Sequence, residues 1–237
     1  MPYLFDTYYL ILVVPALLVS LACQAMVSAA FGKYSKVANA RKLTGAAAAK
    51  ELLRRSGVYD VSVEQVHGRL TDHYDPRSKT LRLSQSVYGS ASVAAVGVAA
   101  HEAGHAIQHA ESYAPLGLRS ALVPVAGIGS GAGPYLALFG LIAAIDWLVT
   151  IGILLFTVAV LFYLVTLPVE FDASRRALAR LYDYGILSGD ELAGSKKVLR
   201  AAAMTYVASA LVAVASLARL LLQARGRGYG GGDGRRR

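Results

Sequence analysis

Charged residues are scarce in this 237-residue chain, where Asp, Glu, Lys and Arg together make up 16% and hydrophobic residues 55%. Soluble domains carry about 25% charged residues, so the composition excludes an ordinary soluble domain and predicts an integral membrane protein. The chain also has a single cysteine, Cys23, which lies within an uncharged segment. One cysteine excludes a disulfide framework and a cysteine-based metal site, and it favours a small apolar packing role.

Charge is absent altogether from four long segments. At about 1.5 Å rise per residue, the first three are long enough to cross a hydrocarbon core of about 30 Å. The last can cross if Arg219 extends its side chain to the interface. The first lacks the basic start of a signal peptide, so we expect it to remain as an anchor. The segments are Thr7–Gly32, Ala121–Ile145, Trp147–Val169 and Ala201–Ala218.

The positions of Lys and Arg predict the orientation of these spans. Seven basic residues lie between positions 33 and 55, directly after the first span, and none precedes it. The positive-inside rule therefore places segment 33–119 in the cytoplasm. Two spans separate it from the basic segment 170–200, so both segments should lie on the same side. The arginines of the tail, 223–237, conflict with this rule if the fourth segment crosses completely, and the sequence leaves that side open.

The most specific motif is His101-Glu102-Ala103-Gly104-His105, an instance of H-E-x-x-H that follows a run of alanine and valine. On a helix, the i, i+4 spacing places both imidazoles on one face, where they can bind one Zn²⁺. Glu102 lies beside them as a potential general base. The alternative is an ordinary helix with two polar residues, but the chain has only five His, so a chance match should be uncommon.

The residues around this motif predict a small α+β unit. Thr44 is suited to be the N-cap of a helix over 45–56, which Gly57 closes. The alternating segments 61–66 and 80–83 predict two strands, with a turn at 75–78 between them. Ser90 is the expected cap of the helix that carries His101 and His105 and ends near Ala110. Gly104 within that helix predicts close packing.

A catalytic zinc site takes three protein ligands, so a third must be found. The metzincin extension would need Gly at 108 and His at 111, but the chain has Gln108 and Glu111, which excludes that class. Glu111 lies about 9 Å from His105 along the helix axis, and His109 faces a similar difficulty. Glu170 is the better candidate. Pro168 suits the first turn of a new helix, and a carboxylate at a membrane boundary is energetically costly unless it has a partner, which a zinc ion would be. The alternative is that Glu170 and Asp172 bind no metal and only stabilise the start of that helix.

Several stretches resemble one known family. They are Gly68-Arg-Leu-Thr-Asp-His-Tyr-Asp-Pro76, Leu81-Arg-Leu-Ser84, Ala99-Ala-His-Glu-Ala-Gly-His-Ala-Ile-Gln108 and Leu167-Pro-Val-Glu-Phe-Asp-Ala-Ser174. Together they resemble the YugP-like family of putative neutral zinc membrane metallopeptidases, over about Leu4 to Leu222. The site is similar to that of the membrane gluzincins, the CAAX prenyl endopeptidase and HtpX group, in which a downstream E-x-x-A-D supplies the third ligand.

The resemblance implies that Glu170 is the third zinc ligand and that Ala173 matches the alanine of the pattern. Ser174 stands where the pattern has Asp, so a carboxylate that orients the histidines must come from elsewhere, with Asp172 a candidate. The implied activity is that of an endopeptidase with one Zn²⁺ per chain, held by His101, His105 and Glu170, and with Glu102 as the general base.

Some parts of this mechanism stay open in the sequence. His67, His73, Tyr74 and Tyr88 could stabilise the oxyanion, although a structural role is the default for each. A peptide substrate could add as an extended strand beside segment 80–83. The alternative function is that of a zinc-binding, non-proteolytic membrane scaffold, but a scaffold would need the ligands and not Glu102. A transporter is disfavoured because the spans carry almost no charge.

The expected fold is mainly α and integral to the membrane, with about four transmembrane helices and a small cytoplasmic α+β zincin-like catalytic domain. The substrates implied are membrane proteins or unfolded polypeptides near the cytoplasmic face of the cell membrane. The net charge of +9 favours contact with anionic lipid, and the tail is too short to predict nucleic-acid binding. The expected divisions are 1–32, first transmembrane helix; 33–119, metallopeptidase domain; 120–169, transmembrane hairpin; 170–200, helical segment with the third ligand; 201–222, fourth transmembrane helix; and 223–237, disordered tail.

Overall fold

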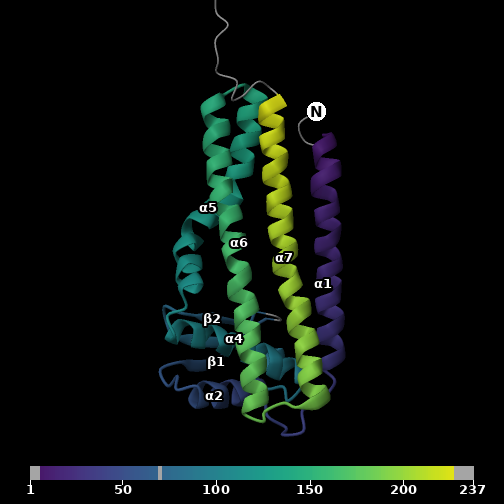
Figure 1. The fold of residues 1–237 in the computed structure, drawn as a ribbon, viewed down its shortest axis with the longest axis vertical. Coiled ribbons are helices and arrows are strands. Elements are labelled where there is room, and N and C mark those ends of the chain that lie inside the picture. Colours follow the sequence, from purple (N-terminus) through teal and green to yellow (C-terminus); the bar gives the residue numbers. More distant parts are fainter. Residues whose placement is uncertain (1–5, 69–70, 227–237) are drawn as a thin grey trace, which may run out of the picture. The chain divides into compact units, whose positions relative to one another are not determined.

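The structure is a computed structural model that describes residues 6–68 and 71–226. It is mainly helical, with one small sheet, and Figure 1 shows the elements in chain order. The elements are the π-helical turn η1 (Tyr9–Val13), α1 (Val14–Tyr34), α2 (Gly45–Arg55), β1 (Ser62–Val66), β2 (His73–Asp75), β3 (Thr80–Ser84), α3 (Gln85–Tyr88), α4 (Val93–Ala110), α5 (Ala114–Ala143), α6 (Asp146–Asp183) and α7 (Gly189–Gly226).

Among the described residues, four helical segments are long and apolar enough to cross a membrane, as the uncharged runs predicted. They are η1 with α1, then α5, α6 and α7. Each helix extends beyond its uncharged run at one end or at both, because the charged residues that end a membrane span do not end a helix. The tail prediction was partly wrong, since residues 223–226 are the last turn of α7. The remaining tail residues, 227–237, lie outside the described part of the chain.

The chain divides into two compact units, and the four long helices α1, α5, α6 and α7 each contain residues of both. The first unit contains residues 1–22, 118–166 and 206–237. The second contains residues 23–117 and 167–205, and it includes the sheet, the H-E-x-x-H motif and Glu170.

Prolines do not interrupt these helices. The prediction that Pro168 begins a new helix was wrong, because α6 continues through it from Asp146 to Asp183. Pro124 and Pro134 likewise lie inside α5. Apolar surroundings offer the backbone no water, so a helix that keeps its other hydrogen bonds is favoured over an open break, and proline is tolerated.

Glycines allow α5 and α6 to approach closely in the first unit. A Cβ on Gly129 would lie 2.2 Å from the carbonyl oxygen of Leu155, and one on Gly152 would lie 2.3 Å from the backbone nitrogen of Ala137. The glycine-rich segment 127–133 is therefore a helix-packing surface, as small residues often are in membrane helices, and not a phosphate-binding loop.

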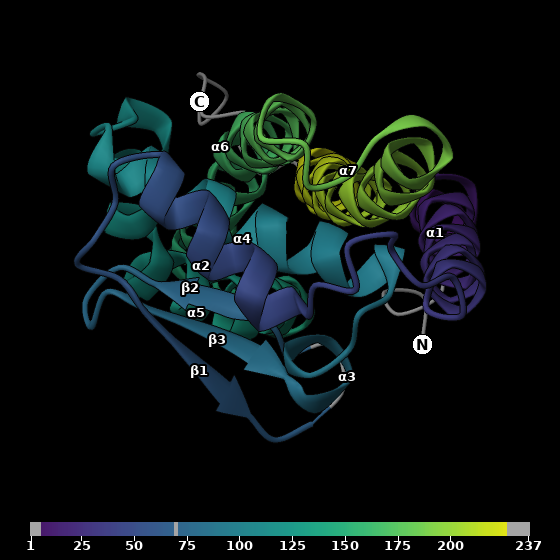
Figure 2. The same ribbon diagram turned by 90° about the horizontal axis from the view of Figure 1, so that it is seen from below.

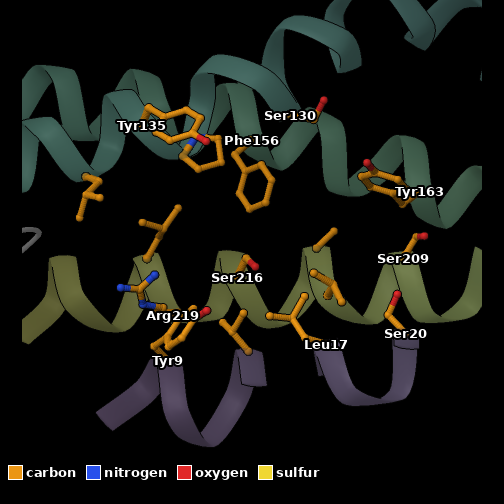
Figure 3. Close-up of a pocket in the computed structure, with 16 residues that line it drawn as sticks. Tyr9, Leu17, Ser20, Ser130, Tyr135, Phe156, Tyr163, Ser209, Ser216 and Arg219 are labelled. Atoms are coloured by element: carbon orange, nitrogen blue, oxygen red, sulfur yellow. The ribbon is translucent and has the colours of Figure 1, made fainter. Parts of the chain in front are cut away.

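A cavity of about 590 Å³ lies within the first unit, among α1, α5, α6 and α7. Figure 3 shows hydroxyl groups from all four helices around it, with Arg219 near Tyr9. The Arg219 guanidinium lies 2.9 Å from a carboxylate oxygen of Asp6, so its charge is balanced within the unit. The hydroxyl-bearing residues are Tyr9, Ser20, Ser130, Tyr135, Tyr163, Ser209 and Ser216.

The second unit contains a three-stranded sheet in the order β1-β3-β2. β3 pairs in parallel with β1 and antiparallel with β2. Helices α2 and α4 pack on this sheet, and Leu52, Leu83 and Ile107 belong to their shared core (Figure 2). The α2 prediction is confirmed, including its cap, because the Thr44 hydroxyl accepts a hydrogen bond from the Ala47 amide.

Two local predictions need correction. Helix α4 begins at Val93, and its N-cap is Ser92, whose hydroxyl accepts from the Ala95 amide. Ser90, the predicted cap, instead donates to the Ser92 hydroxyl. The strand β2 was also missed, because three residues are too few for an alternating pattern to register.

Candidate metal centre

Helix α4 presents its two motif histidines to the same space. The rings of His101 and His105 are 4.7 Å apart at their centroids and meet edge to face. The small residues Ala99, Ala100 and Ala103 are fully buried and let neighbouring elements approach this helix. His105 is buried and His101 half-buried, so the two imidazoles lie at the edge of the core.

Glu170 reaches the same space from α6. A Cβ on Gly104 would lie 2.6 Å from the carbonyl oxygen of Ala173, so only glycine allows α4 and α6 this contact. The prediction of a packing reason for Gly104 is therefore confirmed. The close approach brings Glu170 Oε2 within 3.1 Å of His101 Nε2 and 3.6 Å of His105 Nε2.

These three side chains fit a metal ion. One potential ligand atom from each lies within 4.8 Å of the other two. In a tetrahedral zinc site with bonds of about 2.0–2.1 Å, neighbouring ligand atoms are about 3.3 Å apart. The two carboxylate–imidazole distances, 3.1 and 3.6 Å, lie on either side of that value. The glutamate is 2% exposed, and a carboxylate is so deeply buried only when charged or polar partners compensate it.

A chain of hydrogen bonds sets the tautomer of His105. The amide nitrogen of Gln108 donates to the Val169 carbonyl, at 2.9 Å, and to Asp172, at 2.8 Å. Since this nitrogen faces two acceptors, the amide oxygen must face His105 Nδ1, 3.0 Å away. Nδ1 therefore carries the proton, and the lone pair of Nε2 is available to a metal.

His101 is held by a different group. The Ser174 hydroxyl lies 3.1 Å from His101 Nδ1, at the position where the gluzincin pattern has an aspartate. A hydroxyl can accept from Nδ1–H as a carboxylate does, but without charge. The expectation that Asp172 orients a histidine is met indirectly, since it acts through Gln108 on His105. Gln108 was missed in the sequence, although its i+3 spacing from His105 places both on one helix face.

The other candidate ligands have other partners. Glu111 forms ion pairs with Arg176 and Arg180. His109 Nδ1 lies 2.8 Å from the Tyr74 hydroxyl, one helical turn beyond His105. Asp172 pairs with Arg176 as well as with Gln108. The structure thus brings Glu170 to the two motif histidines and engages the alternatives elsewhere.

Glu102, the predicted general base, lies on α4 between the two histidines and is 9% exposed.

The four residues considered for the oxyanion are placed differently. His73 Nδ1 lies 2.8 Å from the Thr71 carbonyl, and His67 Nδ1 lies 3.4 Å from the Gln85 amide. Tyr88 packs against the core. The Tyr74 hydroxyl is hydrogen-bonded to His109 of the motif helix. Burial, together with the nearby charges of Asp60 and Asp75, raises the pKa of Tyr74 to about 12, so its hydroxyl stays protonated at neutral pH.

The strand expected to receive a substrate cannot do so. Segment 80–83 lies in β3, which is the central strand and has both edges occupied. The backbone edges that remain unpaired within the described sheet belong to β1 and β2. Since β2 contacts α4, it is the edge strand on the side of the motif helix.

Two imidazoles and a carboxylate, with a further glutamate beside them, are the ligand set of the catalytic His₂Glu zinc sites of metallopeptidases. The comparison with known proteins agrees with this class. The family model described as "putative neutral zinc metallopeptidase" matches residues 9–225, and the chain belongs to that family.

A relative in Bacillus subtilis (strain 168) carries the name "Putative membrane protease YugP". It is 46% identical over 214 residues, which cover 90% of this chain and 95% of that protein. No solved structure matches the chain. The family resemblance seen in the sequence is therefore confirmed, and the relative's name, with the four apolar helices, indicates a multi-pass membrane protein.

Proposed function

We propose that this protein is a membrane-embedded, zinc-dependent endopeptidase of the gluzincin type that hydrolyses peptide bonds near the cytoplasmic face of the cell membrane. The observation that carries the proposal is the convergence of His101 Nε2 and His105 Nε2 on Glu170 Oε2. Each histidine has its other ring nitrogen bound to an orienting group, as metal-bound histidines do.

The chain's own residues would supply the proton transfers. His101, His105 and Glu170 would hold the Zn²⁺, which would supply a water whose pKa is lowered toward about 7. Glu102 would take the proton of that water as its oxygen attacks the peptide carbonyl carbon. It would then deliver the proton to the nitrogen as the C–N bond breaks, so that the products are a carboxylate and an amine. The intact Glu102 favours a peptidase over a zinc-binding scaffold, which would not need a base.

The edge of β2 is the proposed place for the substrate backbone. An extended peptide can hydrogen-bond to an unpaired strand edge whatever its side chains, and β2 lies against α4. Tyr74, on this strand, keeps a protonated hydroxyl that can donate to a substrate oxygen.

The segments next to the site in the sequence are membrane segments, which favours the hydrolysis of peptide bonds close to the bilayer. Helix α4 ends at Ala110, four positions before the membrane helix α5 begins at Ala114. Glu170 follows directly on the uncharged run that ends at Val169. Membrane proteins and loosely folded segments can reach such a place, whereas compact soluble proteins cannot.

The first test separates metal binding from catalysis. The purified protein should bind about one zinc per chain. His101→Ala, His105→Ala and Glu170→Ala should each lose most of it, whereas Glu102→Gln should retain it and reduce kcat by about 10²–10⁴-fold. Full zinc content and activity in Glu170→Ala would contradict the ligand set. Zinc-loaded protein that cleaves no reporter would support the scaffold function.

The second test addresses the place of cleavage. A membrane-tethered, unfolded reporter should be cleaved in a chelator-sensitive way by the native protein and not by Glu102→Gln. Cleavage should fall as a longer spacer moves the target segment away from the bilayer. Equal cleavage at every spacer length would contradict the membrane-proximal placement without contradicting peptidase activity.

A further inference from the structure

A second cavity lies in the unit that contains the metal centre, on a different surface from β2. It is a groove of about 1040 Å³ lined by the ends of α1, α6 and α7 that belong to this unit. Figure 2 shows α7 between α6 and α1. This volume lies slightly above the range of small-molecule pockets, about 300–1,000 Å³.

The lining residues include four cations and no anion: Arg175, Lys196, Lys197 and Arg200. Arg175 pairs with Asp172, but the side chains of the other three form no ion pair or hydrogen bond with any described residue. All three are exposed and lie within five positions on α7. The groove therefore carries a concentrated positive charge that the protein does not balance in the part of the chain that the structure describes.

The groove changes from basic to apolar along its length. On α7, Lys196 and Met204 are eight residues apart, which is about 12 Å along the helix axis. On α6, Arg175 is followed toward the uncharged run by Phe171, one turn away. The apolar end is formed by Met26, Phe171 and Met204, which are 53%, 47% and 39% exposed. The uncharged membrane segments of α6 and α7 continue from this apolar end.

We propose that this groove binds an anionic phospholipid of the surrounding membrane. The phosphate would lie between the cations Lys196, Lys197 and Arg200, and the acyl chains would extend along the apolar end toward Met204. Basic pockets between membrane helices bind acidic head groups in this way, each nearby cation contributing about 1 kcal/mol. None of the three proposed metal ligands lines the groove, although Ser174, which contacts His101, does, and the proposal does not depend on peptidase activity.

A polypeptide occupant fits the groove less well. Three helices form the lining, and their backbone groups are already hydrogen-bonded within them, so no strand edge is offered to a peptide. An apolar substrate segment would also gain nothing from three unbalanced cations. The combination of charge at one end and exposed Met and Phe at the other matches a molecule with the same polarity, which a phospholipid has.

A tryptophan placed at the apolar end can report the lipid. Trp147 is the only tryptophan, so the Trp147→Phe, Met204→Trp protein has one emitter, in the groove. The full chain is reconstituted in phosphatidylcholine vesicles with a minor fraction of phosphatidylglycerol. Brominated acyl chains, which quench tryptophan, are carried by the phosphatidylglycerol in one sample and by an equal fraction of phosphatidylcholine in the other.

Quenching should be severalfold stronger when the anionic lipid carries the bromine. The Lys196→Gln, Lys197→Gln, Arg200→Gln variant should quench equally with both lipids. The matched control, Lys36→Gln, Lys50→Gln, Arg54→Gln, removes the same charge from exposed positions outside the groove and should keep the preference. Zinc content, measured in every variant, shows that the second unit is folded.

Three results would overturn the proposal. Equal quenching by both brominated lipids in the protein with its native groove would mean that the head group is not recognised. If both triple variants lost the stronger quenching by brominated phosphatidylglycerol, the effect would come from the overall charge of the protein and not from the groove. Relief of quenching by an added unfolded polypeptide would mean that the polypeptide displaces the lipid and that the groove binds substrate.

Discussion

At the scale of single residues, the candidate metal centre is arranged by side chains other than the three proposed ligands. His105 and His101 have different orienting partners, Gln108 and Ser174. Gln108 is itself fixed by two hydrogen bonds, one of them to the charged Asp172, whereas Ser174 offers a neutral hydroxyl. We infer that His105 is the more firmly oriented of the two histidines.

Gln108→Leu should weaken zinc binding by about 10–100-fold, because His105 would lose the acceptor that fixes its tautomer. Competition with a chelator of known affinity measures the effect. Gln85→Leu is the control, since Gln85 is exposed and lies on α3. Unchanged affinity in Gln108→Leu would show that the chain through Asp172 does not support the site. Thermal unfolding of the zinc-free proteins separates this effect from a loss of folding.

At the scale of elements, the site is made by the contact between α4 and α6. The two helices carry ligand candidates that are 65 residues apart in the sequence, His105 and Glu170. The contact is set by backbone approach at Gly104 and Ala173, not by interlocking long side chains. A small change in helix separation should therefore move the carboxylate relative to both imidazoles.

Gly104→Ala should destabilise the protein and reduce zinc affinity. The added methyl would lie 2.6 Å from the Ala173 carbonyl oxygen, and such overpacking costs about 1–3 kcal/mol, more than the roughly 1 kcal/mol that alanine gains over glycine in a helix. Gly117→Ala is the matched control. Gly117 lies in α5 with open space around its Cβ position, so that variant should be neutral or more stable. Thermal unfolding and zinc titration measure both outcomes, and a native zinc affinity in Gly104→Ala would refute the packing argument.

The turn between β2 and β3 should be sensitive to acid. Hydrogen bonds from the Ser78 hydroxyl and the Arg77 amide, and then from Arg82, lower the pKa of Asp75 to about 2 from its ordinary 3.8. Because the folded pKa is the lower one, the stabilisation is complete above about pH 4 and is lost as the pH falls through about 2. Asp75→Asn should reduce the pH dependence of unfolding in this window, because the variant lacks the stabilisation at pH 7 and has none to lose as the pH falls. An identical acid profile in the variant would contradict this role.

At the scale of the whole molecule, function requires that segments 33–117 and 170–205 lie on one side of the membrane. The even number of spans between them and their shared basic character predict the cytoplasmic side. The chemistry of the site does not depend on which side this is, but the pool of substrates does.

Single cysteines test this topology in a Cys23→Ser background. Arg77→Cys and Asp190→Cys should be protected from an impermeant thiol reagent in intact cells and labelled after the membrane is opened. Asp146→Cys, at the charged and exposed position between the second and third uncharged segments, should be labelled in intact cells and serves as the control. Labelling of only one of the first two in intact cells would place His101 and Glu170 on opposite sides and exclude a shared metal site.

Much of the fold could be predicted from the sequence because the signals are local. Uncharged runs longer than 17 residues identify membrane helices, and Thr44 before an alanine-rich segment identifies α2 with its cap. Two local signals were misleading. Pro168 predicts a helix start in water, but α6 runs through it in apolar surroundings. The strand β2 is too short to give an alternating pattern, so the sequence predicts an accessible edge at segment 80–83, which the structure places in the central strand.

The sequence by itself determined the pair of histidines and the adjacent glutamate, because a five-residue spacing on one helix is a local property. It also indicated Glu170, through a resemblance. Only the tertiary structure decided that Glu170 Oε2 lies between the two imidazoles, that Gln108 connects Asp172 to His105, and that three cations of α7 border an apolar groove. Each of these features depends on the distance and rotation between helices. Backbone contacts such as that of Gly104 with Ala173 set that distance and rotation, and such contacts leave no periodic pattern in the sequence.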